Sequence, residues 1–527
     1  MSGSTPTPAP GRALLLRLTL YGGVPLLAML ACAPLLDAGF QAEDFYWLAL
    51  VRHLDAPLIP FYENVALAYF YRPIGLMFWE LCTWLGGTDP WVHNLLDLLL
   101  HGVNALLIGS VATRLARDRR IGILAGVLFA CLPATSGTAL WTSDRFDPVC
   151  LFFGLLALHA FERALAGRRA FGFLAAASLA LCLSSKEVGL AVAAAMLALL
   201  GWQWLRTRER RWDLLAMVLA PMAVVFVLHT ATVPSFGFSL DGAQSLSALL
   251  GGVGYWWLRL PAAVFGFRPV GAGWWPLLAT AALLALVGLA RAIRQGQEGA
   301  VRLACVGAVM FVVPALLQWP VTRLALSDAA GLGLTINLRF YYLAFAGCAL
   351  LWAAAIAGLR GLRSQWLLLA ASLALALQGF AVAHRVARDW ANETRAPTAA
   401  YLAMGEALGS RSFEPGCRIV LQTSGFPPEF VYYADVIVKA VAPRDSRVLD
   451  CAVFGDVAPY ASIVDARWCS EDAWPGLAVR RQHGVRGLAQ LGNLCILGFA
   501  EPPVPTESAE LARFSVAADG RITPLPP

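Results

Sequence analysis

The sequence predicts an all-α polytopic membrane protein of about eleven transmembrane helices, followed by a small extracytoplasmic α/β domain at the C-terminus. Three observations predict this fold. Hydrophobic residues make up 58% of the chain and charged residues only 14%, whereas soluble domains are about a quarter charged. Apolar runs of roughly 17 to 22 residues, long enough to cross the hydrocarbon layer, take up most of the first 385 residues. Arginines cluster at every second loop between these runs.

The arginine clusters orient the predicted helices. The positive-inside rule assigns arginine-rich loops to the cytoplasm, and with them the N-terminus. Segment 1–12 is then a cytoplasmic tail, and 13–36 is a retained first helix rather than a signal peptide, because it lacks a clear cleavage site. The net charge of +6 reflects this topology and indicates no nucleic-acid partner. The predicted spans are 13–36, 91–113, 121–140, 148–164, 171–184, 187–205, 213–232, 273–293, 303–319, 340–359 and 365–383.

Eleven crossings of an inner (plasma) membrane place the C-terminus on the periplasmic side. The predicted outer segments differ in length and in residue content. Segment 37–90 holds two apolar stretches too short to span, which are expected to lie in the membrane interface. Segment 233–272, with Tyr255, Trp256 and Trp257, has a similar character. The outer face is therefore the predicted location of function.

We expect residues 13–390 to form the transmembrane domain and 391–527 a periplasmic domain. Beyond Trp390 the apolar runs shorten to strand length, starting near Cys417, Tyr433, Ala461 and Asn493, which predicts an α/β unit. Four cysteines lie there: Cys417, Cys451, Cys469 and Cys495. An oxidising periplasm would permit one or two disulfides among them, with three possible pairings for two; buried free thiols are the alternative.

The first outer segment carries the candidate catalytic residues. Glu43 and Asp44 are adjacent carboxylates beside an apolar surface, with Asp37 six residues before Glu43. Partial desolvation raises the pKa of a carboxyl group, which makes it a better proton acceptor at neutral pH. One of the pair would accept a proton while the other orients the acceptor or a metal; an ordinary exposed loop is the alternative.

Several cations are expected at membrane depth on the outer face. Arg72 precedes a proline and an apolar run, Arg145 lies in a short loop with Asp144 and Asp147, and Lys186 interrupts a long apolar stretch. Each suits a phosphate or another anion. The alternatives are a snorkelling side chain for Arg72, a structural ion pair for Arg145, and a pair with Glu187 for Lys186. Arg339 stands beside Tyr341 and Tyr342 and repeats the cation–aromatic pattern.

A polar stripe marks the second predicted span. His93, Asp97 and His101 share one helical face and must point toward the bundle or a wet cavity. Interhelical hydrogen bonding is the favoured role, with a direct site role for His93 or Asn94 as an alternative. The spacing would also permit a metal ligand set, but no convincing metal cage is present, so a divalent cation is only a possible cofactor and no other cofactor is expected.

Taken in order, these motifs resemble the multispanning GT-C glycosyltransferases of the protein O-mannosyltransferase and aminoarabinose-transferase-like group. The resemblance covers roughly residues 13–390. It implies transfer of a sugar from a polyprenyl-phosphate donor to an acceptor hydroxyl, with inversion. It implies Asp44 or Glu43 as general base, Lys186 and Arg339 at the carrier phosphate, and donor or acceptor contacts for Arg72 and Arg145. Tyr342 and His93 complete the predicted substrate-binding set. The sequence has Glu-Asp where many relatives have Asp-Asp or Asp-Glu.

Two other membrane functions are alternatives to this kind of glycosyl transfer. A transporter or flippase of a lipid-linked sugar would also need outer cations, but no paired half-sequences indicate inverted repeats. An O-antigen ligase or polymerase resembles the chain less in the first outer segment. No phosphate-binding glycine loop, nucleophile elbow or zinc spacing is present. The predicted partners are therefore the lipid-linked donor, a lipid, glycan or protein acceptor, and membrane lipids.

Overall fold

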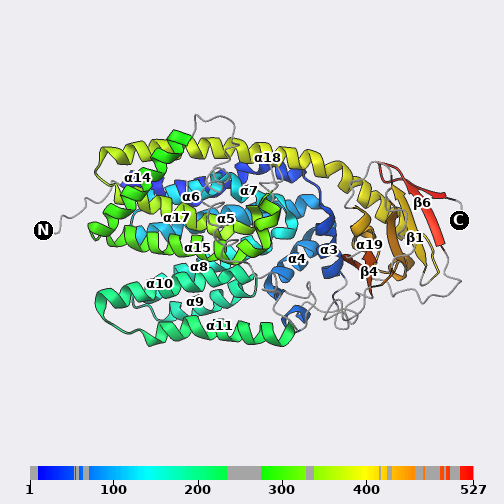
Figure 1. Ribbon diagram of the computed structural model, residues 1–527, viewed down its shortest axis with the longest axis horizontal. Helices are drawn as coiled ribbons and strands as arrows, with labels where there is room; N and C mark the ends of the chain where they lie inside the picture. The colour runs from blue at the N-terminus through cyan, green and yellow to red at the C-terminus, as the bar shows by residue number, and fades with distance from the viewer. Residues whose placement is uncertain are drawn as a thin grey trace.

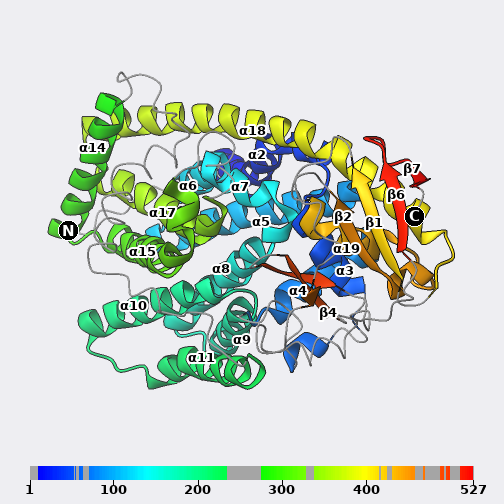
Figure 2. The ribbon, with the colours of Figure 1, turned by 45° about the vertical axis from the view of Figure 1, so that its right-hand side comes forward.

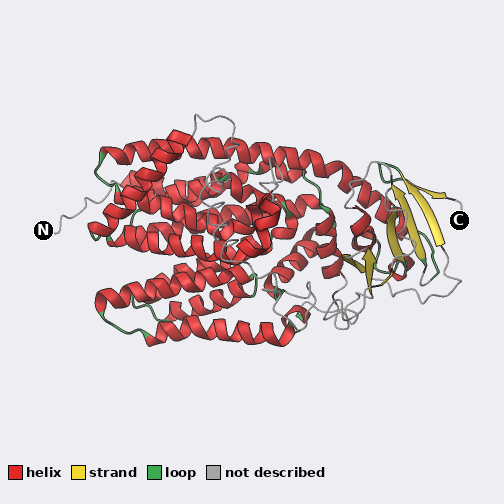
Figure 3. Cartoon of the chain, in the orientation of Figure 1, coloured by secondary structure: helices red, strands yellow, loops and turns green. Residues whose placement is uncertain are grey.

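A computed structural model describes residues 10–52, 54, 58–62, 70–233, 275–327, 338–414, 417–423, 430–456, 467–468, 487–491, 494–498 and 511–525. Within them the chain forms a helical bundle with strands gathered at one end (Figures 1 and 3). Eight helices are long and apolar enough to cross a membrane. The all-α membrane fold with a small C-terminal α/β part is thereby confirmed, and the chain is an integral membrane protein.

Every predicted span coincides with helix in the structure, although the number of crossings stays a prediction. The first is formed by α1 (Pro10–Leu18), a π-helical turn and α2 (Val24–Ala31). The others are α5 (Pro90–Ala116), α6 (Arg119–Cys131) with α7 (Pro133–Leu140), α8 (Phe146–Leu165), α9 (Ala170–Leu183), α10 (Leu190–Thr207), α11 (Trp212–Thr232), α14 (Trp275–Arg294), α15 (Glu298–Ser327), α17 (Tyr342–Gly358) and α18 (Arg363–Gly409).

The predicted span 121–140 is divided in two. Leu132 has an extended backbone between α6 and α7, because the following Pro133 disfavours helical geometry at the residue before it. The division lets the short α7 turn toward the end of the bundle, where Thr138 donates a 2.9 Å hydrogen bond to the carbonyl of Arg339. Pro133 thus sets the position of α7, which contacts the backbone of the candidate site residue Arg339.

Small residues allow the helices to pack closely. A Cβ added to Gly347 on α17 would lie within 3 Å of backbone atoms on α15, and one added to Gly358 would lie as close to Gly288 on α14. Small residues such as glycine let helix backbones approach closely. Helices in lipid usually associate in this way, because the hydrophobic effect does not drive them together there. The bundle core is correspondingly rich in alanine.

Two short helices form in segment 37–90, the predicted first outer segment: α3 (Ala42–Arg52) and α4 (Pro73–Gly86). α3 is buried on most sides and packs against the C-terminal domain. Phe45, Trp47 and Leu48 share a hydrophobic core with Val436 and Ile437 of that domain. Figure 1 places α3 at the end of the bundle that faces the strands, and Figure 2 shows it beside α19 (Phe430–Val441).

The C-terminal domain contains a mixed sheet with strand order β2-β1-β6-β7. β1 (Arg418–Thr423) pairs in parallel with β2 (Ala452–Asp456) and β6 (Leu511–Val516), and β7 (Ile522–Leu525) pairs antiparallel with β6. β3 (Arg467–Trp468), β4 (Gly487–Leu491) and β5 (Leu494–Gly498) form an antiparallel sheet. The predicted strands starting near Cys417 and Asn493 are confirmed as β1 and β5. Of the one starting near Ala461, only β3 lies within the described residues.

The predicted strand starting near Tyr433 is wrong, because these residues form helix α19 (Phe430–Val441). β1 and β2 are parallel, so the chain must cross from the end of one to the start of the other, and such a crossover usually contains a helix. Within α19, Asp435 and Lys439 are an i, i+4 ion pair. Val436, Ile437, Val438 and Val441 of α19 are buried in a hydrophobic core that also includes residues of β1 and α3. Tertiary connection overrides local β-propensity here.

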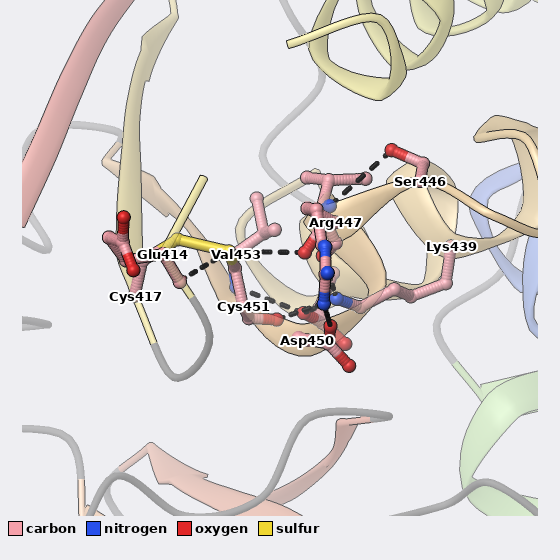
Figure 4. The surroundings of a disulfide bond; sticks show 10 residues. Glu414, Cys417, Lys439, Ser446, Arg447, Asp450, Cys451 and Val453 are labelled. Atoms are coloured by element: carbon pink, nitrogen blue, oxygen red, sulfur yellow. Dashed lines mark hydrogen bonds and ion pairs between the residues drawn. A yellow bond between two sulfur atoms is a disulfide. The ribbon is translucent and has the colours of Figure 1, made fainter. Parts of the chain in front are cut away.

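One disulfide is present in the described residues, between Cys417 and Cys451 (Figure 4). It joins the start of β1 to the residue before β2, next to the buried Lys439, whose ammonium donates to the carbonyls of Val448 and Cys451. The side chains of Cys469 and Cys495 lie outside the described residues. The predicted domain boundary at residue 390 falls inside α18, which continues without a break into the C-terminal domain.

Candidate active site

A cavity of about 580 Å³ lies where α3, α8, α10, α11 and α15 meet, and we call it the Glu43 cavity. Four of the eight predicted site residues line it, namely Glu43, Arg72, Lys186 and Arg339. Its wall also includes apolar side chains from α11 and α15. These are Met222, Val225, Phe226 and Leu317. The cavity therefore combines charged groups with a surface suited to a hydrocarbon chain.

Asp44 is buried beside this cavity and accepts hydrogen bonds from two segments of the chain. Its Oδ1 accepts hydrogen bonds from the backbone N–H and the hydroxyl of Ser143, at 2.6 and 2.5 Å. Its Oδ2 accepts from the N–H of Gln41 at 2.7 Å, while its own N–H donates to the Gln41 carbonyl, which closes the first turn of α3. Burial raises the pKa of the Asp44 carboxyl to about 7, although the hydrogen bond from Ser143 opposes the rise. Asp44 thus connects α3 to the loop before α8.

Glu43 is differently placed. Its side chain is partly buried and lines the cavity, and within the described residues it accepts no hydrogen bond and forms no ion pair. Burial raises the pKa of Glu43 above its ordinary value, whereas the nearby Arg339 lowers it. A carboxylate with a raised pKa and free acceptor oxygens is suited to remove a proton near neutral pH.

Two cations of the cavity, Lys186 and Arg339, share Asp144. The Lys186 ammonium is 3.6 Å from Asp144 Oδ1 and forms an ion pair with Asp147. The Arg339 guanidinium is 3.9 Å from Asp144 Oδ2 and stacks 3.9 Å over the Trp141 ring. The alternative pair of Lys186 with Glu187 is not formed. These carboxylates compensate the buried charges, as a low-dielectric site requires.

Arg72 binds Glu187 through two hydrogen bonds, from Nε to Oε1 at 3.3 Å and from Nη2 to Oε2 at 2.9 Å. Its guanidinium also lies 3.9 Å over the ring of Phe70. The pair lines the cavity and joins the residue before α4 to the 3-10 turn Glu187–Gly189 that precedes α10. Arg72 is therefore anchored rather than snorkelling into the interface.

The remaining predicted residues lie in the interior. Arg145 is enclosed, donates to Asp97 Oδ2 at 2.9 Å and stacks 3.9 Å over Trp79. It is thus in a structural ion pair, but with Asp97 of α5 and not with a carboxylate of its own loop. His93 contacts Arg145 at 3.3 Å and the Gly87 carbonyl at 3.0 Å. Tyr342 and His101 are hydrogen-bonded at 2.7 Å deeper in the bundle. None of the three predicted site residues Arg145, His93 and Tyr342 lines the Glu43 cavity.

Two polar residues of the cavity wall were not singled out from the sequence: His229 at the end of α11 and Gln318 on α15. Each stands alone at the end of an apolar run, so only the packing of distant helices reveals its place. Among the described residues no group of three His, Cys, Asp or Glu side chains could hold a metal ion. The possible divalent cation therefore has no candidate ligand set within that part of the chain.

The fold and the site together define an integral membrane protein with a charged, partly apolar cavity between its helices. No family model and no curated protein matches the sequence. Among solved structures, the chain is similar to ArnT from Cupriavidus metallidurans bound to undecaprenyl phosphate, with 15% identity, a TM-score of 0.44 and coverage of 84% of this chain and 87% of that one. The arabinosyltransferase EmbB from Mycobacterium smegmatis is similar at 17% identity and a TM-score of 0.37, covering 75% and 41%. Since both TM-scores lie below 0.5, the function rests on the side chains of the site.

Proposed function

We propose that this protein is a glycosyltransferase that moves a sugar from a polyprenyl-phosphate donor to an acceptor hydroxyl in the Glu43 cavity, on the periplasmic face. The observation that carries the proposal is the cavity itself. A carboxylate with a raised pKa, three cations and an apolar wall meet in one space. The cations suit the donor phosphate, the wall suits the prenyl chain, and the carboxylate suits an acceptor hydroxyl.

In the proposed reaction the acceptor oxygen attacks the anomeric carbon on the face opposite the phosphate. The bond between that carbon and the phosphate oxygen breaks, and its electron pair leaves with the phosphate. Lys186 and Arg339 stabilise the departing negative charge. The hydroxyl proton passes to Glu43. Direct displacement inverts the anomeric centre, which agrees with the inversion expected from the sequence resemblance.

The surroundings of Glu43 and Asp44 support a different role for each carboxylate. Both oxygens of Asp44 already accept hydrogen bonds from Ser143 and Gln41, so a proton-accepting role for Asp44 would break contacts that hold α3. Glu43 has no such commitment among the described residues. We therefore assign the general base to Glu43 and a positioning role to Asp44.

The test compares cells that carry the wild-type protein with Glu43→Gln, Asp44→Asn and the exposed control Asp37→Asn, at equal membrane abundance. Mass spectrometry measures carrier-linked sugars in each leaflet and sugars on surface acceptors. We expect Glu43→Gln to lower transfer about 10²- to 10⁴-fold while the donor accumulates in the outer leaflet. Asp44→Asn should chiefly lower the thermal stability of the purified protein.

Two results would overturn this proposal. Donor accumulation in the inner leaflet alone would indicate a flippase, which moves the lipid instead of using it. If Glu43→Gln transferred sugar at the wild-type rate and a stably folded Asp44→Asn protein did not, Asp44 would be the general base.

A further inference from the structure

A second cavity, of about 700 Å³, lies at the other end of the bundle. We call it the arginine cavity. It is formed by the C-terminal ends of α5, α8 and α10 and the first turns of α15. Its charged lining residues are Arg114, Arg117, Arg119, Arg206, Arg302, Glu162 and Glu298. Nothing in the proposed transfer reaction uses them.

The two cavities are separated by about the thickness of a bilayer. Phe146, the first residue of α8, lines the Glu43 cavity, and Leu165, its last residue, lines the arginine cavity. A helix of 20 residues is about 30 Å long, which matches the hydrocarbon thickness of a membrane. The arginine cavity therefore opens near the opposite face, which the topology predicts to be cytoplasmic.

The arginine cavity carries more positive charge than its own carboxylates balance. Five arginines face two glutamates, and Arg302 pairs with Glu162 at 2.5 Å. In the described parts of the chain the other four arginines form no ion pair. Two neighbours at the same end of the bundle do find partners, since Arg360 pairs with Asp118 and Arg211 with Asp213. The positive-inside rule explains arginines at this face, but not their convergence on one cavity.

Two hydrogen-bond donors on the cavity wall also lack acceptors. The Arg114 Nε and the Trp202 indole nitrogen are both buried and have no hydrogen-bond partner among the described residues. Buried hydrogen-bond donors nearly always have an acceptor in folded proteins. These two donors therefore indicate an acceptor that the described part of the chain does not supply. Leu165 and Leu199 provide an apolar surface beside these donors.

We propose that the arginine cavity binds the phosphate head group of an anionic phospholipid from the leaflet opposite the Glu43 cavity. Phosphate oxygens accept hydrogen bonds and balance the unpaired guanidinium groups. Basic pockets between transmembrane helices bind lipid head groups in this manner. The lipid, rather than free phosphate, is favoured because leucine and tryptophan side chains line the same cavity at the membrane boundary.

The test uses the full-length protein in nanodiscs of phosphatidylcholine containing a minor fraction of phosphatidylglycerol. Native mass spectrometry counts the phosphatidylglycerol molecules retained on the released protein. The double variant Arg117→Gln/Arg206→Gln removes two exposed cavity charges. The matched control, Arg210→Gln/Arg294→Gln, removes two exposed charges from the same end of the bundle outside the cavity.

We expect the cavity variant to retain phosphatidylglycerol with affinity lower by on the order of 30-fold, since each arginine near the surface contributes about 1 kcal/mol. The control should match the wild type. Equal loss in both variants would show general surface attraction and overturn the site, as would no loss in either. Calorimetric titration with inorganic phosphate identifies the source. If phosphate binds with the same arginine dependence and phosphatidylglycerol is not enriched, the lipid assignment is wrong.

Discussion

At the scale of single residues, Glu43 and Asp44 are neighbours in sequence but have different surroundings. Successive residues on a helix point about 100° apart, so one carboxylate of α3 lines the cavity while the other reaches Ser143. The sequence predicts a role for this pair because its position beside an apolar surface favours a raised carboxyl pKa. It does not predict how the two divide, because Ser143 lies 99 positions away.

The pKa of Glu43 gives a prediction at this scale. The transfer rate should rise with pH as the Glu43 carboxylate forms, at a pH above the ordinary titration of glutamate, because burial raises its pKa. Arg339 opposes that rise. Arg339→Gln should therefore raise the pKa further, move the acidic limb of the pH–rate profile to higher pH, and lower kcat/KM by about 10²-fold.

A pH–rate profile on purified protein measures both effects. Arg385→Gln, which changes an exposed arginine outside the cavity, is the matched control and should leave the profile unchanged. An acidic limb that stays in place in Arg339→Gln would contradict the assignment of Glu43 as the titrating base.

The rest of the site shows the limit of single-sequence inference. Glu43, Arg72, Lys186 and Arg339 could be predicted as a group because charges at membrane depth are costly without a role. Arg145 met the same criterion, yet it pairs with Asp97, which is 48 positions away in the chain. A buried cation looks the same in sequence whether its partner is a ligand or a distant carboxylate. Only the packing of α5 against α8 separates the two cases.

At the scale of elements, the C-terminal domain supports the helix that carries the acidic pair. Arg52, at the end of α3, donates to the carbonyl oxygens of Ala440 and Ala442 at the end of α19, the latter at 3.1 Å. The two helices also share a hydrophobic core. This contact was not predictable, because the sequence indicates a strand where α19 forms and gives no sign that it reaches the first outer segment.

Arg52→Ala should therefore affect both stability and transfer. Loss of the guanidinium leaves two carbonyl groups without their donor, which costs about 1 to 3 kcal/mol of unfolding free energy, and α3 loses its connection to α19. Thermal unfolding and the transfer rate are measured together, with the exposed Arg395→Ala as control. An unchanged transfer rate at a temperature where the variant is folded would show that α3 needs no support from α19.

The disulfide makes a second prediction about this support. Cys417 and Cys451 are 34 residues apart and buried, and closing a loop of that length stabilises the folded state by about 3 to 4 kcal/mol in the chain-entropy model. The Cys417→Ser/Cys451→Ser variant should lose the C-terminal domain to protease faster than the wild type. Wild-type protein treated with a reductant should behave like the variant once its thiols are released. Equal protease resistance in all three would show that the bridge does not stabilise the domain.

At the scale of the whole molecule, the arrangement of cavities at opposite ends of α8 predicts opposite membrane faces for the loops around them. Arg168→Cys, in the exposed loop after α8, should react with a membrane-impermeant maleimide only after cell lysis. Ala518→Cys, in the exposed turn between β6 and β7, should react in intact cells. The unsubstituted chain reports labelling of the native cysteines. Reaction of both positions in intact cells would contradict the topology.

The apolar periodicity was sufficient to place the helices of the bundle, because crossing a membrane fixes both their length and their composition. It was insufficient beyond residue 383, where α18 leaves the expected limits of a span and continues to Gly409. Polar residues enter the helix there without ending it. The composition of a segment indicates whether lipid or water surrounds it, whereas the end of a helix depends on backbone geometry. The change from apolar to polar composition therefore does not mark the end of α18.

The continuity of α18 makes rotation about its axis a functional variable. With 47 residues the helix is about 70 Å long, and it turns Thr394 and Thr398 toward Gly39 and Phe40, immediately before the acidic pair. One residue inserted after Arg385 would advance everything beyond it by about 1.5 Å and rotate it by about 100°. Both threonines would then face away, although every span would keep its length. The rotational position of this helix therefore contributes, together with the contacts of α3 itself, to how the membrane part and the C-terminal domain meet around Glu43.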